Sequence, residues 1–295
     1  MDDWSQWATP RIQQINNYLN EHLPQGHPHK LHEAMRYSVL GSGKRIRGLL
    51  VLASGSLVQA KTEHLLPVSG SIELMHAYSL IHDDLPAMDN DSCRRGKPTC
   101  HIQFGEAQAL LAGDTLQTLA FEWLLTHTHG TPPYTINQMA KILAQRTGSL
   151  GMGGGQAIDL SSAQQTLSIE ELTDMHSRKT GALIQAALEL GVLCGDHPLS
   201  PHHHQALQEY GQTVGLGFQV VDDILDVSQS SSQLGKTAGK DAATHKNTFV
   251  SLLGLTKAQE YAQKLHQKAQ NLLICFDAEA DPLRNLAHFI HHRQK

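Results

Sequence analysis

The sequence predicts an all-α fold, and three observations support this class. Apolar residues recur at spacings of three and four along most of the chain, which is the helical period. The long runs of alternating Val, Ile and Thr that are typical of strands are absent from the sequence. Breaks rich in Gly, Pro or Ser separate the periodic stretches, at Gly26–Pro28, Pro86, Gly130–Pro133, Gly195–Pro201 and Ser228–Gly239.

These breaks delimit the expected helices in chain order. One stretch ends before Gly26, another ends at Pro86, and a third ends before Gly130. Ser168 followed by Glu171 is a capping box, so it predicts the start of a helix. The full set of predicted helical stretches is 8–23, 31–60, 65–85, 102–127, 135–151, 169–193, 202–227, 246–253 and 257–275.

Two Gly-containing segments lie outside this pattern. Gly148–Gly155 is not a phosphate-binding P-loop, because no Gly-Lys-Ser/Thr follows it. We interpret it as a close approach of two helices or a kink. The polar segment 228–240 predicts a long mobile loop, which we expect to close over a site and to become ordered when substrate binds.

Composition bounds the function. The 295 residues carry a formal net charge of −5, which argues against a nucleic-acid-binding protein. No apolar run approaches the roughly 20 residues that span a membrane, and the acidic N-terminus does not resemble a secretory signal. The four cysteines form no zinc or disulfide pattern, so we expect a cytoplasmic protein with reduced thiols. The histidine runs His202–His204 and His291–His292 are interpreted as solvated surface.

We expect residues 1–295 to form one domain. A weak internal repeat supports this expectation, because each half contains a cation (Lys44 or Lys179), then an apolar helix, then carboxylates. Two helical halves that face one central cavity would account for the repeat.

Two aspartate clusters are the main chemical signal, Asp83-Asp84-Leu-Pro-Ala-Met-Asp89 and Asp222-Asp223-Ile-Leu-Asp226. Each follows an apolar helical stretch, where carboxylates are costly to bury without a partner. Asp222 and Asp226 share a helix face by their i, i+4 spacing. Asp89 would lie about 120° around an unbroken helix from Asp83. We therefore expect the break at Pro86 to return Asp89 towards Asp83.

Sites made only of carboxylates favour Mg²⁺, which keeps waters and bridges to substrate phosphates. The same chain supplies cations, and arginine forks suit phosphate oxygens. Acidic and basic groups together predict a diphosphate ligand held through magnesium and a second diphosphate held without metal. The candidate cations are Lys44, Arg47, Arg94, Arg95, Lys179, Lys236, Lys240 and Lys246.

These motifs resemble the short-chain trans-prenyltransferases (polyprenyl synthases), and among them the bacterial type of farnesyl diphosphate synthase. The most specific stretch is His76–Asp89 with Arg94-Arg95-Gly96, which resembles the first Asp-rich motif of the family. Phe218–Asp226 resembles the second motif. Gly41–Arg47, Gly151–Leu160 and Lys179-Thr180-Gly181 also match, so the resemblance covers nearly the whole chain. One departure is the run Asp89-Asn-Asp-Ser-Cys93, where close relatives often carry further acids.

The resemblance implies a fold, an activity and a cofactor. The fold is the isoprenoid synthase fold, all-α around a deep central cavity, usually as a homodimer. The activity is condensation of isopentenyl diphosphate with dimethylallyl or geranyl diphosphate, which gives farnesyl diphosphate and releases diphosphate. Geranyl or geranylgeranyl diphosphate is the alternative product. The implied cofactor is Mg²⁺, as three ions with substrate bound and with Mn²⁺ as a substitute.

The resemblance also assigns roles to residues. Asp83, Asp84, Lys179 and Asp222 are the expected catalytic residues. The remaining assignments fall into three groups: metal ligands Asp83, Asp84, Asp89, Asp222 and Asp226; isopentenyl diphosphate ligands Lys44, Arg47, His76 and Arg95; allylic diphosphate ligands Arg94, Lys179, Thr180, Gln219, Lys236 and Lys246.

Chain length of the product is expected to depend on Tyr78 and Ser79, which lie about one helical turn before Asp83. Tyr78 is large enough to stop a growing apolar chain. The other interpretation of Tyr78 is an ordinary core residue.

Four other classes of protein fit the sequence less well. An HD-type metal phosphohydrolase needs histidine ligands, and the second cluster has none beside it. A ferritin-like protein needs Glu-x-x-His on two helices, and only Glu73–His76 fits. A terpene cyclase needs no second diphosphate site, and a non-catalytic helical subunit would be expected to lack the aspartates.

Overall fold

The structure is a computed structural model that describes residues 3–41, 43–128, 130–162, 165–228 and 247–293. Within those ranges the chain is helical apart from one short antiparallel hairpin, so the all-α prediction is confirmed. The first half comprises α1 (Asp3–His22), α2 (His29–Val39), α3 (Ile46–Ser56), α4 (Thr62–Asp83), β1 (Cys93–Arg94), β2 (Lys97–Pro98), α5 (Cys100–Phe104), α6 (Glu106–Thr126) and α7 (Pro133–Thr147). The second half comprises α8 (Met152–Ser161), α9 (Ile169–His176), the π-helix η1 (Ser177–Gly181), α10 (Ala182–Val192), α11 (Pro201–Ser228), α14 (Phe249–Leu253), α15 (Leu255–Leu272), the 3₁₀ turn η2 (Ala278–Ala280) and α16 (Asp281–His292).

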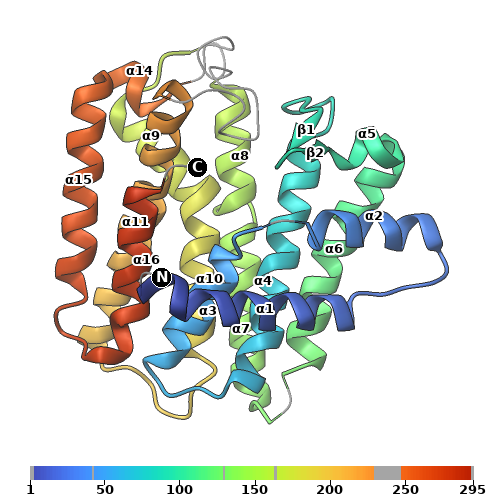
Figure 1. The fold of residues 1–295 in the computed structure, drawn as a ribbon, viewed down its shortest axis with the longest axis horizontal. Helices are drawn as coiled ribbons and strands as arrows, with labels where there is room; N and C mark the ends of the chain where they lie inside the picture. The colour runs from blue at the N-terminus through green and yellow to red at the C-terminus, as the bar shows by residue number, and fades with distance from the viewer. Residues whose placement is uncertain (1–2, 42, 129, 163–164, 229–246, 294–295) are drawn as a thin grey trace.

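Most of the long helices run roughly along one direction, and α1 crosses them (Figure 1). The hairpin β1–β2 and α5 lie together at one end of the molecule in this view. The hairpin pairs Cys93 with Pro98 and Arg94 with Lys97, so it turns the chain sharply just after the first aspartate cluster. No helix among the described residues is long and apolar enough to cross a membrane.

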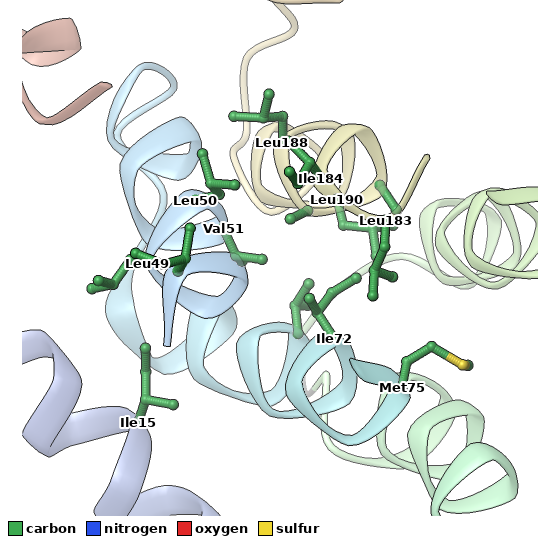
Figure 2. Packing of buried hydrophobic residues seen from close by; sticks show 14 of the residues in the cluster. Ile15, Leu49, Leu50, Val51, Ile72, Met75, Leu183, Ile184, Leu188 and Leu190 are labelled. Carbon is green, nitrogen blue, oxygen red and sulfur yellow. The ribbon is translucent and has the colours of Figure 1, made fainter. Parts of the chain in front are cut away.

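Two apolar clusters carry the fold. The larger one packs α3, α4 and α10 together, and Figure 2 shows Val51, Ile72 and Leu183 from these three helices converging on one another. The smaller one joins α9, α11, α14 and α15 through residues such as Val220, Leu225 and Phe249. Because burial of apolar surface is the main driving force of folding, α4 and α11 are held firmly where their aspartates begin.

The structure corrects several predicted boundaries. The stretch 31–60 is two helices, interrupted after α2. Arg45 adopts a left-handed backbone there (φ 53°), and its Nη2 donates to the carbonyls of Val39 at 2.7 Å and Gly41 at 3.3 Å. These bonds satisfy carbonyls that a continuing helix would have bonded. The stretch 102–127 is also broken, at Gly105 (φ 87°).

Two helices were not predicted. The first is α8, which contains the low-propensity run Gly153–Gly155. The second is α16, although its buried residues Leu283, Leu286, Ala287 and Ile290 follow the helical period. The predicted capping box is present, with the Glu171 amide donating to Ser168 at 3.2 Å and the Ser168 amide donating to Glu171 at 2.8 Å.

The end of α16 also corrects the interpretation of His291 as solvated surface, whereas His292 is exposed as expected. The ring of His291 stacks on His266 of α15 at 4.8 Å between centroids, and His291 Nδ1 is buried. Burial, reinforced by the neighbouring imidazoles, lowers the pKa of His291 to about 4. A neutral imidazole can therefore stay packed between the two helices.

The Gly-rich segment is a close helix approach, as predicted. A methyl group on Gly155 would lie 2.2 Å from the backbone nitrogen of Lys179, in η1. A methyl group on Gly217, by contrast, would meet only Leu265 Cβ at 3.8 Å, an ordinary contact. The absence of a side chain at position 155 thus allows α8 to pack directly against the turn that carries Lys179.

We expect Gly155→Ala to lower the free energy of unfolding by about 1–3 kcal/mol, because the methyl group must push α8 away from η1. Gly217→Ala is the matched control, and we expect it to leave stability unchanged or to raise it by up to about 1 kcal/mol, since Ala is the better helix former. Urea unfolding of both variants measures the difference. Equal midpoints for the two variants would contradict the close approach.

Candidate active site

The first aspartate cluster lies where α4 ends. Asp83 is the last residue of the helix, and beyond Pro86 the chain folds back so that the Asp89 amide donates to the Asp83 carbonyl at 2.9 Å. The predicted return of Asp89 to Asp83 is therefore confirmed. Burial raises the pKa of Asp83, Asp89 raises it further, and Lys179 opposes both. Two carboxylates held this close favour a cation between them.

Asp84 points to a different partner. Its carboxylate accepts Nε of Arg94 at 2.9 Å and Nη2 at 2.6 Å, a bidentate pair between the end of α4 and the hairpin. Only 3% of Asp84 is exposed. Asp84, which was expected to bind metal, and Arg94, which was expected to bind the allylic diphosphate, thus bind each other. This pair fixes the hairpin against α4.

The second aspartate cluster lies on the last turns of α11. Asp222 is partly exposed and accepts Nη2 of Arg293 at 2.7 Å. Asp223 is buried and accepts the Phe249 amide at 2.7 Å, so it caps the start of α14. Asp226 is 3% exposed, and its Oδ2 is buried without a hydrogen-bond partner among the residues that the structure describes.

The donor chemistry of these clusters fits magnesium. A buried carboxylate oxygen without a donor is costly, and a divalent cation would satisfy Asp226 Oδ2. The close carboxylates of Asp83 and Asp89 fit for the same reason. Over the part of the chain that the structure describes, no group of three or more His, Cys, Asp or Glu side chains is gathered closely enough to hold a metal ion.

The π-helix η1 connects the two clusters. Lys179 Nζ donates to Asp159 of α8 at 2.6 Å. The charge of Lys179 also lowers the pKa of Asp83, at the end of α4. Thr180 Oγ1 donates to Gln219 at 3.2 Å, and Gln219 donates to Asp223 at 3.3 Å. Hence one turn faces the first cluster through Lys179 and holds α11 through Thr180.

The cations predicted to bind isopentenyl diphosphate gather beside α3 and α4. Arg47 Nη1 lies 3.1 Å from His76 Nε2. Arginine can only donate, so Nε2 accepts and His76 is neutral with its proton on Nδ1. Burial first, and then the charges of Arg47 and Arg95, lower the pKa of His76 well below its usual value.

The rest of this cationic cluster closes around Gly43. The guanidinium of Arg95 would lie 2.8 Å from a methyl group on Gly43, and the next residue is Lys44. Lys44 Nζ lies 5.6 Å from the ring centroid of Phe289. Arg45 contributes a further buried charge, which forms an ion pair with Glu73 at 3.4 Å. The four predicted ligands Lys44, Arg47, His76 and Arg95 therefore lie in one region, and this region is close enough to the second aspartate cluster for Asp222 to act on Arg47.

The predicted chain-length residues lie on α4, which packs against α6. Burial raises the pKa of Tyr78, the charge of Asp83 raises it further, and Gln117 of α6 hydrogen-bonds its hydroxyl. The ring of Tyr78 meets His82 edge-on at 5.3 Å. Ser79 Oγ donates to the carbonyl of His76 at 2.8 Å, so it bonds within its own helix. Both residues precede the first cluster, as expected.

Sequence reasoning missed two partners and named three residues that lie outside the described ranges. Asp159, the partner of Lys179, lies in the stretch Gly151–Leu160 that resembles the family, and its acidic side chain was the available signal. Arg293, the partner of Asp222, had no local signal beyond its charge. Lys236, Lys240 and Lys246 lie outside the described residues, as does the predicted loop 228–240 apart from Ser228, which ends α11.

Comparisons with known proteins indicate the same family that the sequence motifs resemble. The family model described as polyprenyl synthetase matches residues 28–273. The farnesyl diphosphate synthase of Haemophilus influenzae is 45% identical, covering 95% of this chain and 96% of the relative. The large subunit 1 of a heterodimeric, chloroplastic geranylgeranyl pyrophosphate synthase from Arabidopsis thaliana is 42% identical, covering 99% of this chain and 80% of the relative. The crystal structure of a geranyltransferase from Helicobacter pylori, complexed with magnesium and isoprenyl diphosphate, matches with a TM-score of 0.84 and 35% identity, over 98% of this chain and 97% of that one.

We expect His76 to stay neutral in the folded protein well below pH 6.5, because burial and Arg47 disfavour its charged form. The unfolded chain binds that proton near pH 6.5, so unfolding takes up a proton and stability falls as the pH drops below that value. The contribution of His76 to this slope is at most about 1.4 kcal/mol per pH unit.

Proton NMR of the His76 Hε1 resonance, assigned by its loss in His76→Asn, measures the titration directly. We expect no titration step between pH 8 and about 6, and a shallower loss of stability for His76→Asn than for the unchanged chain. A midpoint near 6.5 for His76 would contradict the buried pair with Arg47.

Proposed function

The chain belongs to the polyprenyl synthetase family and is a short-chain trans-prenyltransferase, and we propose that its product is farnesyl diphosphate. The substrates would be isopentenyl diphosphate and the allylic dimethylallyl and geranyl diphosphates. The 45% identity with a bacterial farnesyl diphosphate synthase over nearly the whole of both chains supports this product. Family membership also argues against the HD-type phosphohydrolase considered from the sequence.

The observation that carries the proposal is the presence of two kinds of polar site in one chain. One is acidic, with Asp83 and Asp89 on one side and Asp222 and Asp226 on the other, and with Lys179 of η1 facing the first cluster. The other is cationic and contains Arg47, Arg95 and the neutral His76. A reaction between two diphosphates, one bound through metal and one without, needs both kinds of site.

In this proposal magnesium is held by Asp83, Asp89, Asp222 and Asp226, and by a lone pair of Asp84 that the hydrogen bonds from Arg94 leave open. The related structure from Helicobacter pylori contains magnesium with its diphosphate ligand, which supports the choice of metal. When bound, the ions would stabilise the negative charge that develops on the departing diphosphate. Three ions, with Mn²⁺ as a substitute, remain the expectation from the sequence.

The side chains of this protein would supply the rest of the chemistry. Lys179 would exchange Asp159 for an oxygen of the allylic diphosphate, and Thr180 and Gln219 would orient the same group. Fixed donors aimed at a leaving group favour bond cleavage because they stabilise charge as it develops. Arg94 would add a charge while it keeps its bonds to Asp84.

The cationic site would hold the second substrate. Arg47 and Arg95 would contact the diphosphate of isopentenyl diphosphate, with Lys44 at the exposed edge. His76 is neutral with Nε2 accepting from Arg47, so it would orient that guanidinium. The released diphosphate would accept the proton lost in the elimination step, so no side-chain base is required.

We further propose a cytoplasmic homodimer. A dimer is supported by large apolar side chains that remain exposed on α5 and α6, among them Ile102 at 55% and Leu111 at 50%. Exposed apolar residues gathered on neighbouring helices are typical of protein interfaces. The cytoplasmic location is supported by the bacterial relative, whereas the plant relative is described as chloroplastic.

The direct test is a condensation assay with purified protein, Mg²⁺, isopentenyl diphosphate and geranyl diphosphate. We expect farnesyl diphosphate and inorganic diphosphate as products. Hydrolysis of the allylic substrate without condensation would contradict the proposal.

Asp83→Ala and Asp222→Ala should each lower kcat by roughly 10²–10⁴-fold, the scale for removing one electrostatic element of a transition state. Asp196→Ala is the control, because Asp196 is exposed between α10 and α11 and belongs to neither cluster. Steady-state kinetics at saturating Mg²⁺ make the comparison. Near-normal turnover in either cluster variant would refute the assignment of that aspartate.

Tyr78→Ala should shift the products from C15 towards C20, because it removes the ring that would block a growing chain. Tyr78→Phe keeps the ring and should leave the product length unchanged. Chromatography of the dephosphorylated products distinguishes the two variants. If Tyr78→Ala still makes only C15, another residue sets the length, and the geranylgeranyl synthase among the relatives shows that products differ within the family.

A further inference from the structure

Arg293 joins the end of the described chain to the second aspartate cluster. It follows α16 directly, and its Nη2 donates to Asp222 Oδ1 at 2.7 Å and to the Phe218 carbonyl at 2.8 Å. The guanidinium carbon also lies 3.8 Å from the ring centroid of Phe218. Only 6% of the Arg293 side chain is exposed, against 33% for Asp222. The arginine is thus a buried group placed behind a partly exposed carboxylate.

All three contacts come from one face of α11. Phe218 and Asp222 are four residues apart, so their side chains lie above one another on the helix. Arg293 holds the carbonyl and ring of the first and the carboxylate of the second. Because the Phe218 contacts do not involve the aspartate, the arginine is anchored whether or not Asp222 binds a further cation.

The geometry distinguishes two roles for this arginine. An arginine that competed with the metal would hydrogen-bond the carboxylate oxygen that binds the metal and would have to leave when metal binds. Among the contacts of Arg293 with Asp222, the hydrogen bond goes to Oδ1. A one-sided bond from a buried, anchored donor fixes the side-chain torsions of the aspartate and leaves Oδ2 available.

We propose that Arg293 is a positioning residue for Asp222: it holds Oδ1 so that Oδ2 is presented to the magnesium of the second aspartate cluster. This inference rests on the proposed function, since it assigns magnesium to that cluster. The proposed role of Arg293 links metal affinity to the packing of α16, whose buried face lies against the rest of the fold. Loss of a hydrogen-bond partner behind a metal ligand typically weakens metal binding by about 10–100-fold.

The test compares Arg293→Gln with Arg284→Gln. Arg284 is a matched control at the other end of α16, where it donates to Asp281 Oδ1 at 2.6 Å and to the carbonyls of Leu273 and Phe276. Binding of Mn²⁺ is measured by electron paramagnetic resonance in the presence of inorganic diphosphate. We expect Arg293→Gln to raise the Kd for Mn²⁺ by about 10–100-fold. Arg284→Gln should leave that Kd unchanged even if it lowers the urea midpoint, because it does not touch the cluster.

A kinetic measurement separates positioning from a general loss of structure. Arg293→Gln should raise the Mg²⁺ concentration for half-maximal activity while kcat at saturating Mg²⁺ changes much less. Arg293→Lys should recover part of the affinity, since it restores one charged donor without the planar fork.

Two results would overturn the inference. Unchanged Mn²⁺ affinity in Arg293→Gln would make Arg293 purely structural, and tighter binding would make it a competitor for the metal. Both differ from a failure of the proposed function, in which the unchanged chain binds Mn²⁺ and diphosphate but forms no condensation product.

Discussion

The site depends on the π-helical turn Ser177–Gly181, because this turn couples the two halves of the molecule. A π-turn adds one residue to a helix and redirects the side chains beyond it. Here neighbouring helices approach the turn closely from two sides, α8 at Gly155 and α11 at Gly215, where a methyl group would lie 2.9 Å from Gly181 Cα. As a result Lys179 acts on Asp83 while the next residue, Thr180, bonds to α11. Packing from two sides thus holds the turn whose side chains reach the first aspartate cluster and α11.

Around this turn, several charged groups of the site already have a partner within the protein. Asp84 binds Arg94, Lys179 binds Asp159, and Asp222 binds Arg293. These ion pairs differ in how much free energy is needed to break them. The Asp84 pair is bidentate and its carboxylate is buried, so breaking it would leave a buried charge without a partner at a cost of several kcal/mol. The Lys179 pair is monodentate and both of its side chains are partly exposed, so its exchange for a phosphate oxygen costs much less. The hairpin therefore acts as fixed support, and Lys179 is the group free to change partners.

Features that depend on local geometry could be predicted from the sequence. The helical class, the capping box at Ser168 and the return of Asp89 beyond Pro86 each depend on a few neighbouring residues, and each is confirmed. The pairs that orient the site were not predictable in this way. Arg293 reaches Asp222 from 71 residues away, and nothing near either residue encodes that contact. The split of the stretch 31–60 depends on Arg45, whose fork bonds the carbonyls at the end of α2, and helical periodicity does not report such a bond.

The cationic site has a consequence for how two similar substrates are told apart. Arg45, Arg47 and Arg95 lie close enough for each to act on His76, and burial lowers the pKa of Arg47 to about 10. One buried carboxylate, Glu73, offsets part of this charge through its pair with Arg45. Positive charges held together in a poorly solvated site repel one another. A highly charged free diphosphate relieves this repulsion, whereas a diphosphate whose charge is neutralised by metal would not. The aspartate clusters have the opposite preference, because they repel a free anion. Under the proposed function, the charge state of each diphosphate would therefore direct it to its own site before the protein contacts its carbon chain.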